Sequence, residues 1–126
     1  MKSAEWATYK QQWDQKQMPT FLLGWYPDYI DPDDYTSPFA QTDGSKGMGI
    51  YFSDKNWDAL FVKEQTTTSD ATRNATFQQL QKLWTDQVPT APIFQGNLYL
   101  FAKKSISGVK IGPTLIFNYN QLKVSP

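Results

Sequence analysis

The densest group of reactive side chains in the sequence is a run of aspartates set among aromatic residues. These aspartates are Asp28, Asp31, Asp33 and Asp34, and the aromatic residues around them are Trp25, Tyr26, Tyr29 and Tyr35. Clustered carboxylates are the ligands that calcium prefers, but this spacing lacks the glycine at which an EF-hand loop turns. The spacing therefore argues against a dedicated calcium site, and we expect no bound metal.

Three of these carboxylates are explained by the start of a helix. Asp31 is a plausible N-cap, and Pro32 suits the first helical position. Asp33 and Asp34 would then lie in the first turn, where the helix dipole favours anions. Asp28 precedes the cap and has no such structural role. Because a partly desolvated carboxylate binds a cation strongly, Asp28 is the candidate ligand-binding residue.

The sequence gives little support for catalysis. It contains no Cys and no His, which excludes thiol nucleophiles, His-based triads and ordinary zinc sites. Paired carboxylic acids can hydrolyse glycosides, but Glu5 and Glu64 are the only glutamates and both are predicted on helix surfaces. We therefore expect no enzyme activity, no catalytic residue and no cofactor.

The composition indicates a single domain over residues 1–126. Lys and Arg number 12 and balance 12 Asp and Glu, so the chain lacks the basic stripe that nucleic-acid backbones require. No segment approaches the roughly 20 apolar residues of a membrane span. Met1-Lys2 runs directly into an amphipathic segment, so no signal peptide is expected in this chain.

Two N-terminal elements are expected to position the acidic segment. Ser3 is a plausible N-cap of a helix in which Trp6, Tyr9 and Trp13 recur at helical spacing, and such a stripe usually packs in a core. Residues 21–23 form a short apolar run that predicts a buried strand. The aspartates follow the carboxyl end of this strand, which is where α/β folds tend to bind ligands.

Two further helices are predicted, after a polar, glycine-rich stretch over residues 41–49 that indicates a surface loop. The first is capped by Ser53 or Asp54, and the second begins at Ser69 or Asp70. The residues expected to be buried are Trp57, Leu60 and Phe61 in the first helix and Phe77, Leu80, Leu83, Trp84 and Val88 in the second.

Beyond Pro89 the pattern becomes strand-like. Residues 93–94 and 98–101 flank Gly96-Asn97, which suits either a hairpin turn or an extended bend, and residues 115–117 indicate a last strand. The helices and strands mix without strict alternation, so the predicted fold class is α/β, in the mixed α+β sense. Arg73 is the only arginine, and its place near a helix start predicts a specific acidic partner from another segment.

Four motifs, in order along the chain, resemble those of family 5 extracytoplasmic solute-binding proteins, the oligopeptide-, dipeptide- and nickel-binding type. Residues 21–33 resemble the family's strand followed by Gly-Trp, two residues, Asp and then Asp-Pro. Residues 51–60 resemble its helix start with Asp-x-Leu, and residues 73–92 resemble its long helix and Pro-bounded strand. Residues 104–109 resemble its C-terminal Lys-x-Val-x-Gly-Val.

The resemblance implies peptide capture for an ABC permease, in a periplasmic-binding-protein-like type II fold whose two lobes close over the ligand. In the peptide binders the matching Asp takes the peptide's terminal ammonium, which implicates Asp28. Backbone of the same segment contacts the ligand's main chain, which implicates Trp25 and Tyr26. The chain would then be the C-terminal part of one lobe of a periplasmic or cell-surface protein, with surfaces exposed that favour homo-oligomers.

A second function remains open beside this one. The aromatic and acidic segment could instead serve a stand-alone glycan- or protein-binding module. A flat exposed platform of Trp25, Tyr26, Tyr29 and Tyr35 would favour that module. A concave arrangement of the same side chains around Asp28 would favour peptide capture.

Overall fold

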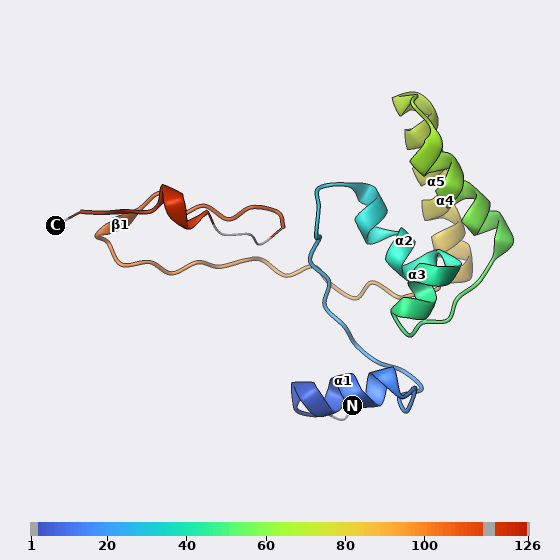
Figure 1. Ribbon diagram of the computed structural model, residues 1–126, viewed down its shortest axis with the longest axis horizontal. Helices are drawn as coiled ribbons and strands as arrows, with labels where there is room; N and C mark the ends of the chain where they lie inside the picture. The colour runs from blue at the N-terminus through green and yellow to red at the C-terminus, as the bar shows by residue number, and fades with distance from the viewer. Residues whose placement is uncertain (1–2, 115–117, 126) are drawn as a thin grey trace.

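The computed structural model describes residues 3–114 and 118–125, and it is helix-rich with a small two-stranded sheet. The elements are α1 (Trp6–Asp14), the 3-10 helix η1 (Pro32–Tyr35), α2 (Ser37–Ala40), α3 (Thr42–Gly47), α4 (Lys55–Thr66), α5 (Asp70–Gln87), β1 (Ile106–Ser107), the 3-10 helix η2 (Tyr119–Gln121) and β2 (Lys123–Val124). Figure 1 shows α2 to α5 gathered in one body, with α1 and the hairpin of β1 and β2 lying apart from it. This mixture of helices and strand is compatible with the predicted class.

The two long helices begin where the sequence predicts. Asp54 caps α4 by accepting hydrogen bonds from the N–H groups of Asn56 and Trp57, at 2.7 and 3.4 Å. Ser69 caps α5 by accepting from the N–H of Thr72 at 3.3 Å. Each cap satisfies a backbone donor that the helix itself leaves unpaired.

The core of the helical body lies between α4, α5 and α2. Its buried apolar residues are Ala40, Trp57, Phe61, Phe77 and Leu80, with Phe52, Leu60, Leu83 and Trp84 packed against them. The predicted stripes are thus confirmed apart from Val88, which is 55% exposed. Val88 has a left-handed backbone (φ 48°) and ends α5, so its side chain leaves the buried face.

The prediction that α1 buries its aromatic stripe is wrong. No residue of α1 is buried, Trp6 is exposed, and the N-cap is Glu5 rather than Ser3. The helix is attached by two aromatic side chains: the indole Nε1 of Trp13 donates to the Met48 carbonyl at 3.0 Å, and the Tyr9 hydroxyl donates to the Leu22 carbonyl at 2.7 Å. Trp13 also packs against Phe21, with ring centroids 5.7 Å apart, whereas Trp6 at the start of the helix is 58% exposed.

The predicted surface loop over residues 41–49 is also wrong, because most of it forms α3. Asp58 on α4 accepts hydrogen bonds from the N–H and the hydroxyl of Thr42, at 2.9 and 2.7 Å, and so stabilises the start of α3. Ser45 is fully buried, and its hydroxyl accepts from the Phe52 N–H at 2.6 Å. These long-range contacts favour the helix despite its poor local propensity.

The predicted apolar strands do not form. Residues 21–23 are extended without a strand partner, and the 93–101 segment is exposed along its whole length. The only ladder among the described residues pairs β1 with β2 in antiparallel register, with Ile106 opposite Val124. A strand requires a neighbour for its backbone groups, and no described segment supplies one to these runs. The strand predicted at 115–117 lies outside the described residues.

No helix in the described part of the chain is long and apolar enough to cross a membrane.

Candidate functional site

The start of η1 confirms the sequence interpretation of Asp31. Its carboxylate accepts a hydrogen bond from the Asp33 N–H at 2.9 Å, and Pro32 occupies the first helical position. This cap fixes the direction of the chain just after the candidate ligand-binding segment. The acidic segment therefore leads into a short, well-defined helical turn rather than a loose loop.

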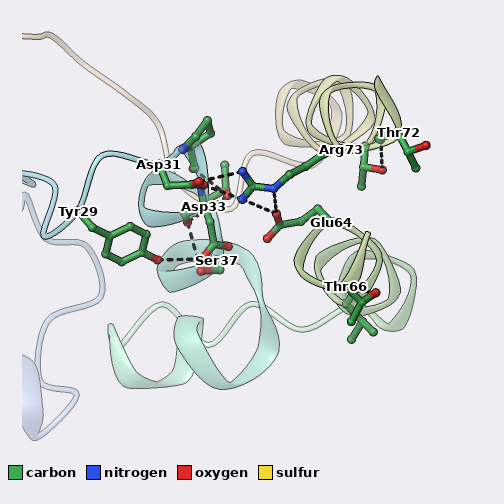
Figure 2. A network of polar contacts seen from close by, with 12 residues as sticks. Tyr29, Asp31, Asp33, Ser37, Glu64, Thr66, Thr72 and Arg73 are labelled. Atoms are coloured by element: carbon green, nitrogen blue, oxygen red, sulfur yellow. Dashed lines mark hydrogen bonds and ion pairs between the residues drawn. The ribbon is translucent and has the colours of Figure 1, made fainter. Parts of the chain in front are cut away.

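Arg73 joins the acidic segment to both long helices (Figure 2). From α5, its Nη1 and Nη2 donate to the two carboxylate oxygens of Asp31, each at 2.8 Å. Its Nε donates to Oε2 of Glu64 on α4 at 3.1 Å. The acidic partner predicted for Arg73 is thus confirmed. The hydrogen bonds from Arg73 are the main reason that the pKa of Asp31 lies below its ordinary value.

The sequence predicted Glu64 on a helix surface, and this prediction is wrong. The residue is buried, with 1% of its surface exposed. It lies on the face of α4 that packs toward α5, three residues after the buried Phe61. Burial, followed by the hydrogen bond and charge of Asp33, raises the pKa of Glu64 to about 7. Because Arg73 occupies only one of its oxygens, Glu64 can hold a proton and donate it to Asp33.

Asp33 connects Glu64 to the aromatic segment. The hydroxyl of Tyr29 donates to Oδ2 of Asp33 at 2.8 Å, as Figure 2 shows. Partial burial and then the contact with Asp33 raise the pKa of Tyr29 to about 12, so the phenol remains a donor at neutral pH. A continuous polar network therefore runs from Tyr29 through Asp33, Glu64 and Arg73 to Asp31.

Asp28 presents its carboxylate to solvent, whereas its backbone is fixed. The Asp28 N–H donates to Oδ2 of Asp34 at 2.8 Å, and Asp34 is 2% exposed. Sequence reasoning placed Asp34 in the first turn of a helix and missed this second role. Asp28 is thus the one aspartate of the segment for which no interaction of the carboxylate is found among the described residues.

Trp25 and Tyr26 lie just before Asp28 but differ in exposure. The indole of Trp25 packs edge-on against Phe39, with ring centroids 5.2 Å apart, and its Nε1 is buried without a hydrogen-bond partner among the described atoms. Tyr26 is 55% exposed. The structure brings Trp25, Tyr26 and Asp28 together on one short segment, and their assignment as ligand contacts stays a prediction.

The acidic segment does not present a metal-binding group. No set of three or more acidic side chains within residues 3–114 and 118–125 is arranged to hold a metal ion. Asp31 is engaged by Arg73, Asp33 by Tyr29, and Asp34 by the backbone of the segment itself. These three carboxylates therefore accept hydrogen bonds within the fold instead of converging on a common point.

Comparison with known proteins relates the chain to peptide-binding proteins. It is 28% identical over 112 residues to the dipeptide-binding protein of Pseudomonas aeruginosa, a match covering 88% of this chain and 21% of the relative. It is 26% identical over 129 residues to di/tripeptide-binding protein 4 of that species, covering 100% of this chain and 24% of the relative. No protein family model matches the chain.

A third relative comes from another species. The probable D,D-dipeptide-binding periplasmic protein of Escherichia coli is 28% identical over 102 residues, which cover 78% of this chain and 20% of the relative. The chain therefore spans about a fifth of the length of these relatives. The similarity is consistent with a segment of a solute-binding protein of the peptide-binding type.

Proposed function

We propose that this chain supplies part of a peptide-binding cleft in the substrate-binding component of an ABC importer. The observation that carries the proposal is the solvent-facing carboxylate of Asp28 on a segment whose other aspartates are held by the fold. A carboxylate with no protein partner, carried by a backbone that is held in place, is suited to the terminal ammonium of a peptide. The relatives named for di- and tripeptide binding support this ligand class.

The rest of the cleft would come from a second lobe. Backbone groups at Trp25 and Tyr26 would bind the main chain of the peptide beside Asp28. The hollows lined by Trp6 and its neighbours on α1, and by Gly108 and its neighbours beside the hairpin, do not include Asp28. The order of the four family motifs along the chain supports the further proposal that it is the C-terminal part of one lobe. The name of the Escherichia coli relative supports a periplasmic location.

Substitution of Asp28 tests the proposal. The hybrid protein for this test carries the present chain in place of the matching segment of the Pseudomonas aeruginosa dipeptide-binding protein. In the hybrid, Asp28→Asn should weaken dialanine binding by at least about 2 kcal/mol, or about 30-fold, because the ligand ammonium loses its countercharge. Isothermal titration calorimetry measures the affinity.

Asp86→Asn is the matched control for Asp28→Asn. Asp86 is an exposed residue of α5, and its substitution removes one negative charge outside the acidic segment. Asp31→Asn would not serve, because it would disrupt the paired hydrogen bonds with Arg73. Equal losses of affinity in the Asp28 and Asp86 variants would contradict the assignment.

The affinity of the isolated chain gives a second test. A single lobe leaves the ion pair at Asp28 in water, where such pairs contribute only about 0–1 kcal/mol. It also lacks the opposite wall whose contacts offset the entropy of association. Calorimetry with dialanine should therefore detect no binding tighter than about 1 mM, roughly 4 kcal/mol, by the chain alone. Micromolar affinity without the second lobe would favour an independent module.

The alternative, a stand-alone glycan- or protein-binding module, is favoured by one observation. Tyr26, Tyr29 and Tyr35 are each about half exposed on the same short segment. Trp25 does not join them in a platform, because its ring packs against Phe39. Saturation-transfer NMR with a panel of oligosaccharides distinguishes the two functions, since the module predicts tyrosine contacts that the peptide cleft does not require.

A further inference from the structure

Asp28 is connected to α5 by three successive polar contacts. Its N–H donates to Asp34, which belongs to η1. Asp31 caps the same 3-10 helix and also receives both Nη groups of Arg73 from α5. The position of the Asp28 backbone therefore depends on where η1 lies, and η1 is held by the guanidinium of Arg73.

We infer that Arg73 is a positioning residue for the ligand contact at Asp28, because it fixes η1, and Asp34 with it, against α4 and α5. The ligand contact itself rests on the proposed function. The attachment of Asp28 to α5 does not, and it can be measured on the chain without any ligand.

Apolar packing supports the chain before Asp28 but gives little support to Asp28 itself and the residues after it. Tyr29 and Ile30, which follow Asp28, are 47% and 78% exposed, and Tyr26 before it is 55% exposed, whereas Pro27 is buried. Trp25 is packed, but it lies three residues before Asp28. Because residues 28–30 make few apolar contacts, hydrogen bonds must supply most of the order from Asp28 onward.

The geometry requires an arginine rather than any cation. The planar guanidinium binds both oxygens of Asp31 at 2.8 Å while its Nε reaches Glu64 at 3.1 Å, so one rigid group joins η1, α4 and α5. A lysine ammonium on a flexible stem carries the charge but cannot reproduce this fork. The ring of Phe77, with its centroid 5.1 Å from the guanidinium carbon, supports the Arg73 side chain from α5.

Amide hydrogen exchange of the full chain tests the inference by NMR. In Arg73→Lys, exchange of the Asp28 amide should accelerate by at least about tenfold, since a charge-assisted pair of hydrogen bonds is lost. The Leu80 amide in the core of α5 reports global opening and should change little. Lys82→Gln is the control, because it removes one positive charge from an exposed position of the same helix.

A second pair of variants tests the next contact along the path. Asp34→Ala removes the acceptor of the Asp28 N–H and should also accelerate exchange of that amide by at least about tenfold. Asp34→Asn keeps a carbonyl acceptor and should restore protection. If Arg73→Lys also accelerates exchange of the Leu80 amide, the variant opens the whole fold. The comparison of the two Asp34 variants then tests whether η1 holds the Asp28 backbone. Wild-type protection of Asp28 in Asp34→Ala would then overturn the inference.

Binding in the hybrid protein completes the test. Dialanine affinity should fall by about tenfold in Arg73→Lys and remain at the wild-type value in Lys82→Gln. Unchanged Asp28 exchange or unchanged affinity in Arg73→Lys, with Leu80 still protected, would overturn the positioning role. If the unsubstituted hybrid fails to bind dialanine, the proposed function fails. The exchange data on the isolated chain then decide whether Arg73 fixes Asp28.

Discussion

At the scale of single residues, Glu64 and Asp33 form a carboxyl pair that requires a proton. Each has one buried oxygen, Oε1 of Glu64 and Oδ1 of Asp33, with no donor among the neighbouring protein groups. Arg73 contacts the other oxygen of Glu64, and Tyr29 contacts the other oxygen of Asp33. Removing the shared proton would place two negative charges together in a poorly solvated region, which is unfavourable.

This pair predicts that stability falls as the pH rises toward neutrality. The pKa of Glu64 is raised from 4.5 to about 7, so the folded state binds the proton more tightly than the unfolded state does. The resulting stabilisation is complete below pH 4.5 and is lost as the pH rises through about 7. Asp31 has a lowered pKa and stays ionised over this range, so it does not contribute to the loss.

Glu64→Gln should remove this pH dependence. The amide keeps an N–H donor for Asp33 without a titrating group, so the loss of roughly 1–3 kcal/mol between pH 5 and pH 8 should disappear. Urea unfolding followed by tryptophan fluorescence measures the difference. Glu5→Gln, at an exposed helix cap, is the control and should retain the wild-type slope. A slope in Glu64→Gln equal to that of the wild type would contradict the shared proton.

The sequence predicted this site in part. The capping role of Asp31 was predicted because a cap depends on residues that are adjacent in the chain. The acidic partner of Arg73 was predicted in kind but not by position, because Asp31 lies 42 residues away. The burial of Glu64 and the bond from Asp34 to the Asp28 backbone have no local pattern. The burial of Glu64 depends on how α4 packs against α5 and the acidic segment, and the hydrogen bond from the Asp28 N–H to Asp34 depends on the fold of the chain between these two residues.

At the scale of elements, the caps of α4 and α5 should contribute unequally to stability. Asp54 accepts two backbone hydrogen bonds with a charged side chain, whereas Ser69 accepts one at 3.3 Å. Asp54→Ala should therefore destabilise the fold by about 1–2 kcal/mol and Ser69→Ala by about 0.5–1 kcal/mol. Chemical denaturation measures both, with Thr68→Ala at an exposed position as the control. A larger loss for Ser69→Ala would contradict this ranking.

Elements were predictable where their signals are local. The α4 and α5 helices combine a cap with an apolar stripe, and the starts of both were predicted correctly. The α3 helix was missed because it depends on Asp58 and on the burial of Ser45 rather than on its own glycine-rich sequence. The apolar runs at 21–23 and 93–101 have strand composition, but composition cannot supply the neighbouring strand that completes hydrogen bonding.

At the scale of the whole molecule, the exposed apolar segment 93–101 predicts self-association. Phe94 and Phe101 are 81% and 94% exposed, and the extended backbone between them lacks a paired strand in the described structure. Such a segment is a template for pairing with another chain. We therefore expect dimers or larger assemblies of the isolated chain in light scattering at high concentration. A strict monomer without bound detergent or partner would contradict this.

Substitution within the segment provides the matched comparison. Phe94→Lys together with Phe101→Lys should shift the population toward monomer, because charges on an exposed strand oppose edge-to-edge pairing. Trp6→Lys, at an exposed position on α1, is the control and should leave the assembly unchanged. An equal shift in both proteins would indicate non-specific association instead.

The left-handed residue at the end of α5 places backbone strain at the point where the chain leaves the helical body. A β-branched side chain is disfavoured at φ 48°, where glycine is the usual helix-ending residue, and such strain costs on the order of 1 kcal/mol or more. Val88 precedes Pro89, and together they fix the direction in which the chain leaves the helical body. A glycine here would relieve the strain but would also free the backbone that sets this direction.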